Sequence, residues 1–366
     1  MKHRYRSGAA LPAKSVLIWR VVQTIMWLVG FFIIFSLLFF PDLGILIFWN
    51  ILIPVAPALL VVFTGLWRNV CPLGITALLP RHAGLSKRKK LSTLQLGKLN
   101  LIAVLLLYMI VPLRHAIFNS NGPATGILII SMAAVSMAMG MIYEWKSAWC
   151  SGLCPVHPVE KLYGINTVMT IPNAHCAHCM NCVVPCPDST PNIHPQVSSK
   201  TIYHTLSGWL IAGGLPGFIW GWFHVPDEAT FTSFAHAVQL YQLPLVGMAV
   251  TLVLYTILLQ LLPAKYHNTV IRCFAAAAVS CYYWFRLPAL FGFGKFNNDG
   301  LLISLRNILP AWSVSAICVA AMAFFFYWIV VRKPNKRSWV IRPAFDSSLK
   351  QKLFIPFFIL LLLINF

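Results

Sequence analysis

The chain has 366 residues, of which 59% are hydrophobic and only 10% are charged. Because a soluble domain carries about 25% charged residues, this composition excludes an ordinary cytosolic enzyme. The formal net charge of +20 would suit a nucleic-acid-binding protein, but no basic stretch is interleaved with aromatic residues. We therefore expect membrane lipid, and no nucleic acid, as the surroundings of this chain.

Apolar runs along the chain predict its membrane spans. A helix needs roughly 20 apolar residues to cross a bilayer core, and eight segments meet this length. They are residues 16–40, 43–66, 99–118, 122–143, 206–223, 236–263, 270–292 and 308–331. A ninth run, 353–366, is shorter and is expected to form a partial span or an interfacial helix. The sequence thus predicts an all-α polytopic membrane protein with eight or nine transmembrane helices.

These runs divide the chain into three parts. Residues 1–143 hold transmembrane helices 1–4, with a loop at 67–98 that contains a Cys-Pro pair. Residues 144–205 form the longest predicted loop, in which Pro, Asn, His and Cys replace Leu and Phe. Residues 206–366 hold helices 5–8 and the short C-terminal hydrophobic segment. The composition of the middle part indicates that the chemistry of the protein lies there.

The distribution of basic residues predicts the orientation of the spans. If the N-terminus is cytoplasmic and each span crosses, the inside segments hold 24 of the 28 Lys and Arg residues. Basic residues favour cytoplasmic loops, so the N-terminus and the loop 144–205 are expected in the cytoplasm. The run Lys87-Arg88-Lys89-Lys90 is best interpreted as a topology anchor near anionic headgroups. The alternative is a docking patch for an acidic donor protein.

One cysteine run in the loop 144–205 has a specific spacing. Cys176, Cys179, Cys182 and Cys186, followed by Pro187, form C-x2-C-x2-C-x3-C-P. This is the bacterial ferredoxin spacing for a 4Fe–4S cluster, in which a tight loop turns three thiolates onto one cubane. Zinc sites usually use two separated pairs of ligands, and disulfides do not suit a reducing cytoplasm. The run therefore predicts an iron–sulfur centre.

Two Cys-Pro pairs follow predicted spans on the same side of the membrane. Cys150 and Cys154 form C-x3-C-P after the fourth span, and Cys71-Pro72 follows the second. Aligned on Cys-Pro, Trp67 stands where the second site has Cys150. Because proline disfavours the helical region for the residue before it, each pair is expected to end a helix. Such turns can direct a thiolate under the bundle towards residues 176–186.

With these motifs, the sequence resembles the membrane-bound 4Fe–4S polyferredoxin family of the NapH, NosR and CcoG type, over about residues 16–195. The resemblance implies the membrane component of a ferredoxin-type quinol dehydrogenase, an oxidoreductase in the bacterial cytoplasmic membrane. It also implies the quinone pool and a redox partner protein as partners. Family members alternatively reduce copper during oxidase assembly. A rival from another class is a structural anchor subunit of a respiratory complex whose cluster is only a relay.

The number of clusters is open. In two-cluster ferredoxins the fourth cysteine of each run binds the other cluster, which would join Cys154 to Cys176, Cys179 and Cys182. Cys186 would then join Cys71 and Cys150, and the eighth ligand would be absent or would not be cysteine. The candidates by proximity are His157, His175 and His178. A single cluster on Cys176, Cys179, Cys182 and Cys186 is the alternative, and we favour two.

Several other residue types could bind a cofactor, but we expect them to have structural roles. The cysteines within predicted spans, Cys273, Cys281 and Cys318, are expected to pack as small hydrophobic residues. Copper and haem are not expected, although their possible ligands are present as methionines and histidines. The methionines are Met132, Met137, Met139 and Met141, and the histidines are His115, His204, His224 and His236.

A quinol site also needs groups that accept protons. Glu144, at the inner end of the fourth span, and His157 are the candidates nearest to the cysteines in sequence. Carboxylates at the membrane boundary are often functional, but a Glu paired with a Lys is the alternative. No phosphate-binding loop, nucleophile elbow or pair of catalytic carboxylates occurs, so hydrolase and kinase functions lack the residues they require.

Overall fold

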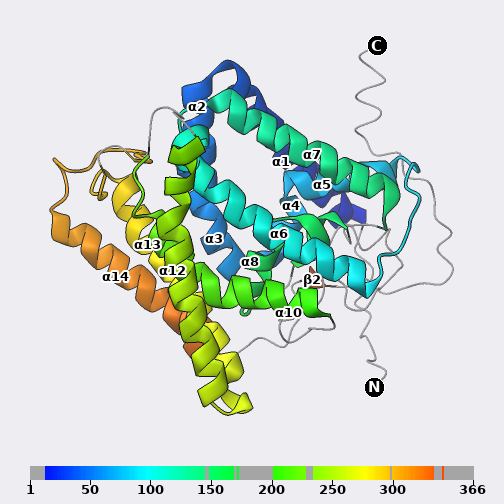
Figure 1. The fold of residues 1–366 in the computed structure, drawn as a ribbon. Helices are drawn as coiled ribbons and strands as arrows, with labels where there is room; N and C mark the ends of the chain where they lie inside the picture. Colours follow the sequence, from blue (N-terminus) through cyan, green and yellow to red (C-terminus); the bar gives the residue numbers. More distant parts are fainter. Residues whose placement is uncertain are drawn as a thin grey trace.

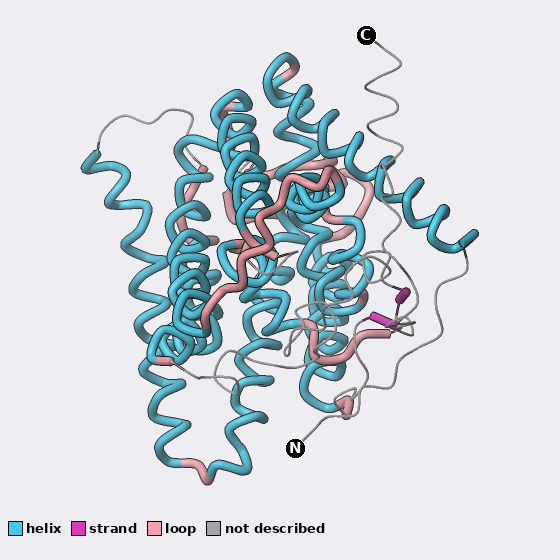
Figure 2. The backbone as a smooth tube through the Cα atoms, turned by 90° about the vertical axis from the view of Figure 1, so that its right-hand side faces the viewer, coloured by secondary structure: helices cyan, strands magenta, loops and turns pink. Residues whose placement is uncertain are grey.

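The structure is a computed structural model that describes residues 13–144, 148–168, 171–172, 201–227, 234–296, 299–333 and 340–341. The described chain is almost wholly helical, and its helices lie mostly alongside one another (Figures 1 and 2). Six of them are long and apolar enough to cross a membrane. They are Leu17–Phe39, Pro41–Val62, Thr93–Phe118, Gly122–Ile142, Val238–Leu261 and Ala311–Val331. The predicted helical membrane protein is confirmed, with six such helices among the described residues.

The remaining predicted spans have different outcomes. Residues 206–223 and 270–292 are helical in the structure, but neither region provides a helix of the length and hydropathy of a span. The first is built from helices of eight residues or fewer, and the second carries Arg272 and Arg286. The run 353–366 lies outside the described residues. The expected count of eight or nine spans therefore stays a prediction beyond the six.

The first half of the chain folds into a series of helices, several of which begin at a capping side chain or a proline. Their bounds are α1 (Ala13–Phe39), α2 (Pro41–Ile45), η1 (Leu46–Leu52), α3 (Ile53–Val62), α4 (Thr64–Val70), α5 (Pro72–His82), α6 (Thr93–Leu113), η2 (Arg114–Phe118) and α7 (Gly122–Ile142). Ser92 begins α6 with a reciprocal capping box to Gln95, and Asn121 caps α7 through the amide of Ala124. These side chains replace the partners that the first amides of a helix lack.

The second half adds further helices, some buried and some exposed, and two short strands. Its elements are η3 (Trp149–Leu153), α8 (Val156–Tyr163), β1 (Ile171–Pro172), α10 (Ile202–Trp209), η4 (Leu210–Gly214), α11 (Leu215–Trp222), α12 (Phe234–Leu261), η5 (Ala264–Tyr266), α13 (His267–Leu290), α14 (Ala311–Phe326), η6 (Tyr327–Val331) and β2 (Val340–Ile341). The strands β1 and β2 pair in parallel, Ile171 with Val340 and Pro172 with Ile341.

The core is formed where α11, α12 and α13 meet. A Cβ atom at Gly217 would lie only 1.8 Å from the carbonyl oxygen of Gly247, so these glycines let α11 and α12 approach closely. Small residues allow this kind of crossing in membrane proteins. Tyr255 and Phe218 are among the largest fully buried side chains of the core. By contrast, α1 and α12 expose many large apolar side chains, as lipid-facing helices do.

Two ends of the bundle carry buried charged groups. The helix α6 separates them, since its 21 residues correspond to about 31 Å at the usual helical rise. We name the end at the start of α6 the cysteine end, because Cys71, Cys150 and Cys154 lie there. We name the other the arginine end, after Arg114 and Arg286. Contacts between segments that are far apart in the sequence hold each end together. At the cysteine end, for example, Asn166 Nδ2 donates to the Trp328 carbonyl at 2.8 Å.

Candidate functional site

The two Cys-Pro turns have the same backbone conformation. Cys71 ends α4 with φ −58° and ψ 119°, and Cys154 ends η3 with φ −64° and ψ 120°. Both angles lie in the extended region that a following proline imposes. The predicted helix ends are therefore present, and each proline starts the next element, α5 or the turn into α8.

The hydrogen bonds of the turns correct the expected alignment. The Cys71 amide donates to the Trp67 carbonyl and the Cys154 amide to the Trp149 carbonyl, both at 2.9 Å. The second bond spans one more residue because η3 is a π-helix. Trp67 thus corresponds to Trp149, and Cys150 occupies the extra residue. The expectation that Trp67 stands in the place of Cys150 was wrong, since a π-turn shifts the register by one.

The three cysteines of these turns come together. A Cβ atom at Gly74, three residues after Cys71, would lie 3.5 Å from Cys150 Sγ and 3.7 Å from Cys71 Cβ. Desolvation raises the pKa of Cys154 well above its usual value, and the negative charges of Glu160, Cys150 and Cys71 raise it further. The thiol groups are thus close enough to influence one another. A cationic centre that binds thiolates would relieve this repulsion.

A buried charged network joins the two turns. Arg68, in α4, lies 3.1 Å from His157 Nδ1 through its Nη1 atom and forms an ion pair with Glu160 in α8. His157 Nδ1 is also 3.2 Å from Glu160 Oε2. All three side chains are buried. Because Arg68 precedes Cys71 by three residues and His157 follows Cys154 by three, the network fixes one turn against the other.

Burial sets the protonation of this network. Desolvation is the main effect on His157 and lowers its pKa to about 4, so the ring is neutral near pH 7. Desolvation raises the pKa of Glu160, but the Arg68 guanidinium and the hydrogen bond of His157 outweigh it and hold that pKa below its usual value. The network therefore combines one cation, one anion and a neutral imidazole.

Glu144, the other expected proton acceptor, lies in a separate contact at the same end. Its Oε1 atom is 3.5 Å from Arg81 Nη2, and the side chain is buried. Its amide donates to the Lys89 carbonyl at 3.0 Å, and the Lys87 amide donates to the Met141 carbonyl at 2.7 Å. The expected pairing of Glu144 with a basic residue is present, although the cation is Arg81 and not a Lys. The basic run 87–90 is thereby attached to the end of α7.

The ferredoxin run itself lies outside the described residues. This applies to Cys176, Cys179, Cys182 and Cys186 and to the candidate ligands His175 and His178. Within the described ranges, no three side chains of His, Cys, Asp or Glu are grouped so that they could hold one metal ion. The predicted cluster ligands that the structure describes are thus Cys71, Cys150 and Cys154. Cys71 and Cys150 lie on either side of Gly74, and the three do not form one three-ligand metal group.

The residues that are expected to have structural roles have contacts of their own. Cys318 is buried in the core, and its Sγ atom contacts the Trp284 carbonyl at 3.8 Å. His204 Nδ1 is 2.8 Å from Thr201 Oγ1, and His224 Nδ1 is 2.7 Å from the Trp220 carbonyl. Met141 is 41% exposed on α7. In the described part of the chain, each of these histidine nitrogens has a partner other than a second histidine.

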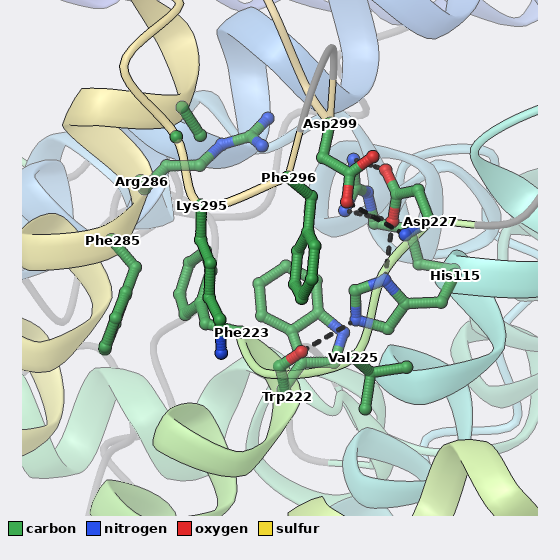
Figure 3. A pocket seen from close by; sticks show the side chains of 13 residues that line it. His115, Trp222, Phe223, Val225, Asp227, Phe285, Arg286, Lys295, Phe296 and Asp299 are labelled. Atoms are coloured by element: carbon green, nitrogen blue, oxygen red, sulfur yellow. Dashed lines mark hydrogen bonds and ion pairs between the residues drawn. The ribbon is translucent and has the colours of Figure 1, made fainter.

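The arginine end holds a site that the sequence analysis did not identify. Arg114 and Asp227 form two hydrogen bonds, Nη1 to Oδ1 at 3.3 Å and Nη2 to Oδ2 at 3.1 Å. His115 Nδ1 is 2.5 Å from Asp227 Oδ1, and its Nε2 is 3.0 Å from the Trp222 carbonyl (Figure 3). Asp299 Oδ2 accepts a hydrogen bond from the Asp227 amide at 2.9 Å. A small pocket of about 30 Å³ opens beside these residues.

One signal in the sequence could have indicated this second site. Arg114 and Arg286 lie at the ends of apolar segments, where a buried cation is costly and usually has a function. In the sequence they stand out only as two of the few basic residues on the predicted outer side. Their partner Asp227 is 113 residues from Arg114, so no local spacing connects them.

Comparison with protein-family models, with curated proteins and with solved structures finds no match to this chain.

Proposed function

We propose that the protein is an electron-transfer subunit of the bacterial cytoplasmic membrane, with two 4Fe–4S clusters at the cysteine end. It would pass electrons between the quinone pool and a redox partner protein, as an oxidoreductase of the polyferredoxin type. The observation that carries this proposal is that two Cys-Pro turns of equal backbone geometry bring Cys71 and Cys150 to either side of Gly74, with Cys154 ending the second turn. Packing alone gives no reason for two sulfur-bearing turns to repeat one conformation and meet.

The residues present suit an iron–sulfur cluster. Thiolates are the ligands that such clusters use, and three thiol groups lie here at the ends of helices. Gly74 has no side chain, so nothing at that position covers Cys150 Sγ, which a Cβ atom would contact at 3.5 Å. The donor chemistry is therefore appropriate.

The contacts also support one division of the ligands between two clusters. Gly74 faces Cys71 and Cys150 and has no atom of Cys154 within 4 Å of its ideal Cβ position. Cys71 and Cys150 would thus serve one cluster together with Cys186. Cys154 would join Cys176, Cys179 and Cys182 on the other, following the exchange of the fourth cysteine in two-cluster ferredoxins.

The chain's own residues would support electron transfer in two ways. A 4Fe–4S cluster, when bound, supplies a centre that accepts and releases one electron at a time. Arg68, His157 and Glu160 hold the two turns in register. Quinol releases two protons when it is oxidised, and Glu144 and His157 are the candidate acceptors. The pKa of His157, lowered to about 4 by burial, makes its ring a weak base and counts against it in this role.

The direction of the site in the membrane follows from the charge distribution. The 24 to 4 split of basic residues supports a cytoplasmic cysteine end, since positive residues favour the cytoplasmic side. The pairing of β1 with β2 agrees with this arrangement, because residues 171 and 340 must then lie on one side. The redox partner would therefore approach from the cytoplasm.

Substitution of Cys71 tests the proposal where the structure supports it. We expect Cys71→Ala to lose close to half of the iron and to alter the EPR spectrum of the reduced protein, with the first cluster retained. Cys273→Ala is the matched control, because Cys273 lies in α13 and is assigned to packing. Full iron and an unchanged spectrum in Cys71→Ala would favour one cluster on Cys176, Cys179, Cys182 and Cys186.

A further inference from the structure

The pocket at the arginine end has no role in the proposed electron transfer, and charged side chains line it. Three basic residues, Arg114, Arg286 and Lys295, and the imidazole of His115 face two carboxylates, Asp227 and Asp299. The two groups come from segments that are far apart in the sequence, at the ends of α6, α11 and α13. The net charge of this lining decides which ligand it suits.

The first carboxylate is already fully engaged. Both oxygens of Asp227 are held by Arg114 and His115, and these contacts outweigh desolvation and keep the pKa of Asp227 below its usual value. His115 faces acceptors with both ring nitrogens, Asp227 Oδ1 and the Trp222 carbonyl. Both oxygens of Asp227 are thus occupied by side chains other than Arg286 and Lys295.

Arg286 adds a second buried cation that has only neutral hydrogen-bond partners. Its Nη2 atom donates to the Trp49 carbonyl at 2.6 Å and to Asn50 Oδ1 at 2.9 Å. Among the described residues, no carboxylate lies within ion-pair distance of Arg286 or Lys295. Arg286 is only 3% exposed. Asp227 attracts it electrostatically but forms its ion pairs with Arg114 and His115. Because a buried charge without a direct ion pair is costly, an anion in the pocket would reduce this cost.

The backbone around Arg286 leaves space for its guanidinium group. Gly300 has φ +68°, and a Cβ atom there would lie only 1.9 Å from Arg286 Nη1. The loop that follows α13 therefore requires glycine at this place, both for the left-handed conformation and for the arginine. The position of Arg286 in the pocket wall is thus built into the fold.

The rim of the pocket combines the long side chain of a lysine with aromatic rings. Lys295 is exposed, and its Nζ atom lies 5.3 Å from the centre of the Phe296 ring. Phe223 and Phe285 stack with their ring centres 5.4 Å apart on another part of the wall. Figure 3 shows these side chains around one opening. Cations beside apolar rings at the ends of membrane helices suit the headgroup region of a lipid.

We propose that this pocket binds a phosphate-type oxyanion, supplied either by the headgroup of an anionic phospholipid or by a free phosphate. Arg286 and Lys295 would contact the oxyanion, since guanidinium and ammonium groups both bind phosphate oxygens. Asp299 opposes binding by its charge, and it is the only carboxylate of the lining without a described ion pair. Two cations of the lining, Arg286 and Lys295, also have no described ion pair, so positive charge is in excess. The site is independent of the cysteine end.

The test uses the full chain purified in detergent and follows its thermal unfolding midpoint. Inorganic phosphate is compared with chloride at equal ionic strength, and short-chain phosphatidylglycerol with phosphatidylcholine. A rise with both phosphate and phosphatidylglycerol indicates that the oxyanion suffices. A rise with phosphatidylglycerol alone assigns the site to lipid, and a rise with phosphate alone assigns it to a free anion. Equal effects of phosphatidylglycerol and phosphatidylcholine, with none of phosphate over chloride, would overturn the proposal.

Two matched lysine variants locate the effect. Lys295→Gln removes the rim cation, and Lys265→Gln removes an exposed lysine that lies 4.9 Å over the Tyr266 ring outside the pocket. We expect Lys295→Gln to weaken binding of the effective anion by about tenfold, which corresponds to 1.4 kcal/mol, and Lys265→Gln to bind like the wild type. Equal affinity in the two variants would contradict the assignment. Because Lys295 is exposed, its variant avoids the folding defect expected for a substitution of Arg286.

Discussion

The two ends of α6 both hold buried ionic networks, but they are assembled in different ways. At the cysteine end, Arg68, His157 and Glu160 lie within a few residues of cysteines in short Cys-Pro motifs. At the arginine end, Arg114 meets Asp227 across 113 residues, and Asn50 meets Leu301 across 251. A cluster site needs several thiolates on a tight loop and so leaves a local spacing. An ionic pocket can take each side chain from a different helix.

The largest expected effect concerns the sides of the membrane on which the two ends lie. Reporters fused to truncations after Lys200 and after Asp227 should behave as cytoplasmic and external, respectively. The reason is the preference of Lys and Arg for cytoplasmic loops, which places the cysteine end inside. The measurement is all-or-none, with a periplasmic alkaline phosphatase and a cytoplasmic fluorescent protein as complementary reporters. The reverse pattern would move the proposed entry of electrons to the other face.

The second effect separates cluster binding from folding. Cys179→Ser should remove one cluster, about half of the iron for two clusters, because the run C-x2-C-x2-C-x3-C-P loses a ligand. Membrane insertion should be unchanged, since it depends on the apolar helices. Iron content and the amount of protein in the membrane fraction are measured together. Parallel loss of protein and iron would show that Cys179 serves folding instead.

The third effect tests the network that joins the Cys-Pro turns. Arg68→Met leaves Glu160 buried without its cation, and loss of one partner of a buried ion pair costs about 3–5 kcal/mol. We expect a large fall in the thermal unfolding midpoint and weaker iron retention, with partial rescue in Arg68→Lys. Arg81→Met is the control, because its ion pair with Glu144 is longer, at 3.5 Å, than the pair of Arg68 with Glu160. If both Met variants were equally stable, Arg68 would have no special role.

The smallest effect concerns the arginine end. Gly84 and Gly300 have φ +75° and +68°, but a Cβ atom at Gly84 meets nothing within 4 Å. Alanine in a left-handed conformation costs about 1–2 kcal/mol, so Gly84→Ala should lose only this amount. Gly300→Ala should lose more, because the new methyl group would displace Arg286. Thermal unfolding of the two variants gives the difference, and equal losses would mean that Arg286 can move away without cost.

The sequence predicts the long apolar helices and the Cys-Pro turns well, because each depends on local chemistry. Hydropathy identifies the lipid-facing helices such as α1, and proline imposes the extended conformation of Cys71 and Cys154. The sequence is a poorer guide to α13, which it predicts as a membrane span. That helix is largely buried by its neighbours and carries Arg272 and Arg286, so lipid does not determine its composition.

Other features of the site could not be predicted because they depend on tertiary structure. The π-turn at η3 inserts a residue between Trp149 and Cys154, which no alignment of Cys-Pro pairs can detect. The contacts of Arg68 with His157 and Glu160 join elements that are about ninety residues apart. The pocket at the arginine end likewise requires the packing of three helices before its residues meet.

The central claim is that the cysteine end holds iron–sulfur clusters, and the composition of the purified protein tests it most directly. The measurement is the iron and acid-labile sulfide content of the anaerobically purified wild-type chain, with EPR of the reduced form. The account predicts a brown protein with close to eight iron and eight sulfide per chain, as two 4Fe–4S clusters require, and a reduced-cluster EPR signal. A protein without iron, or with one zinc per chain, would contradict it.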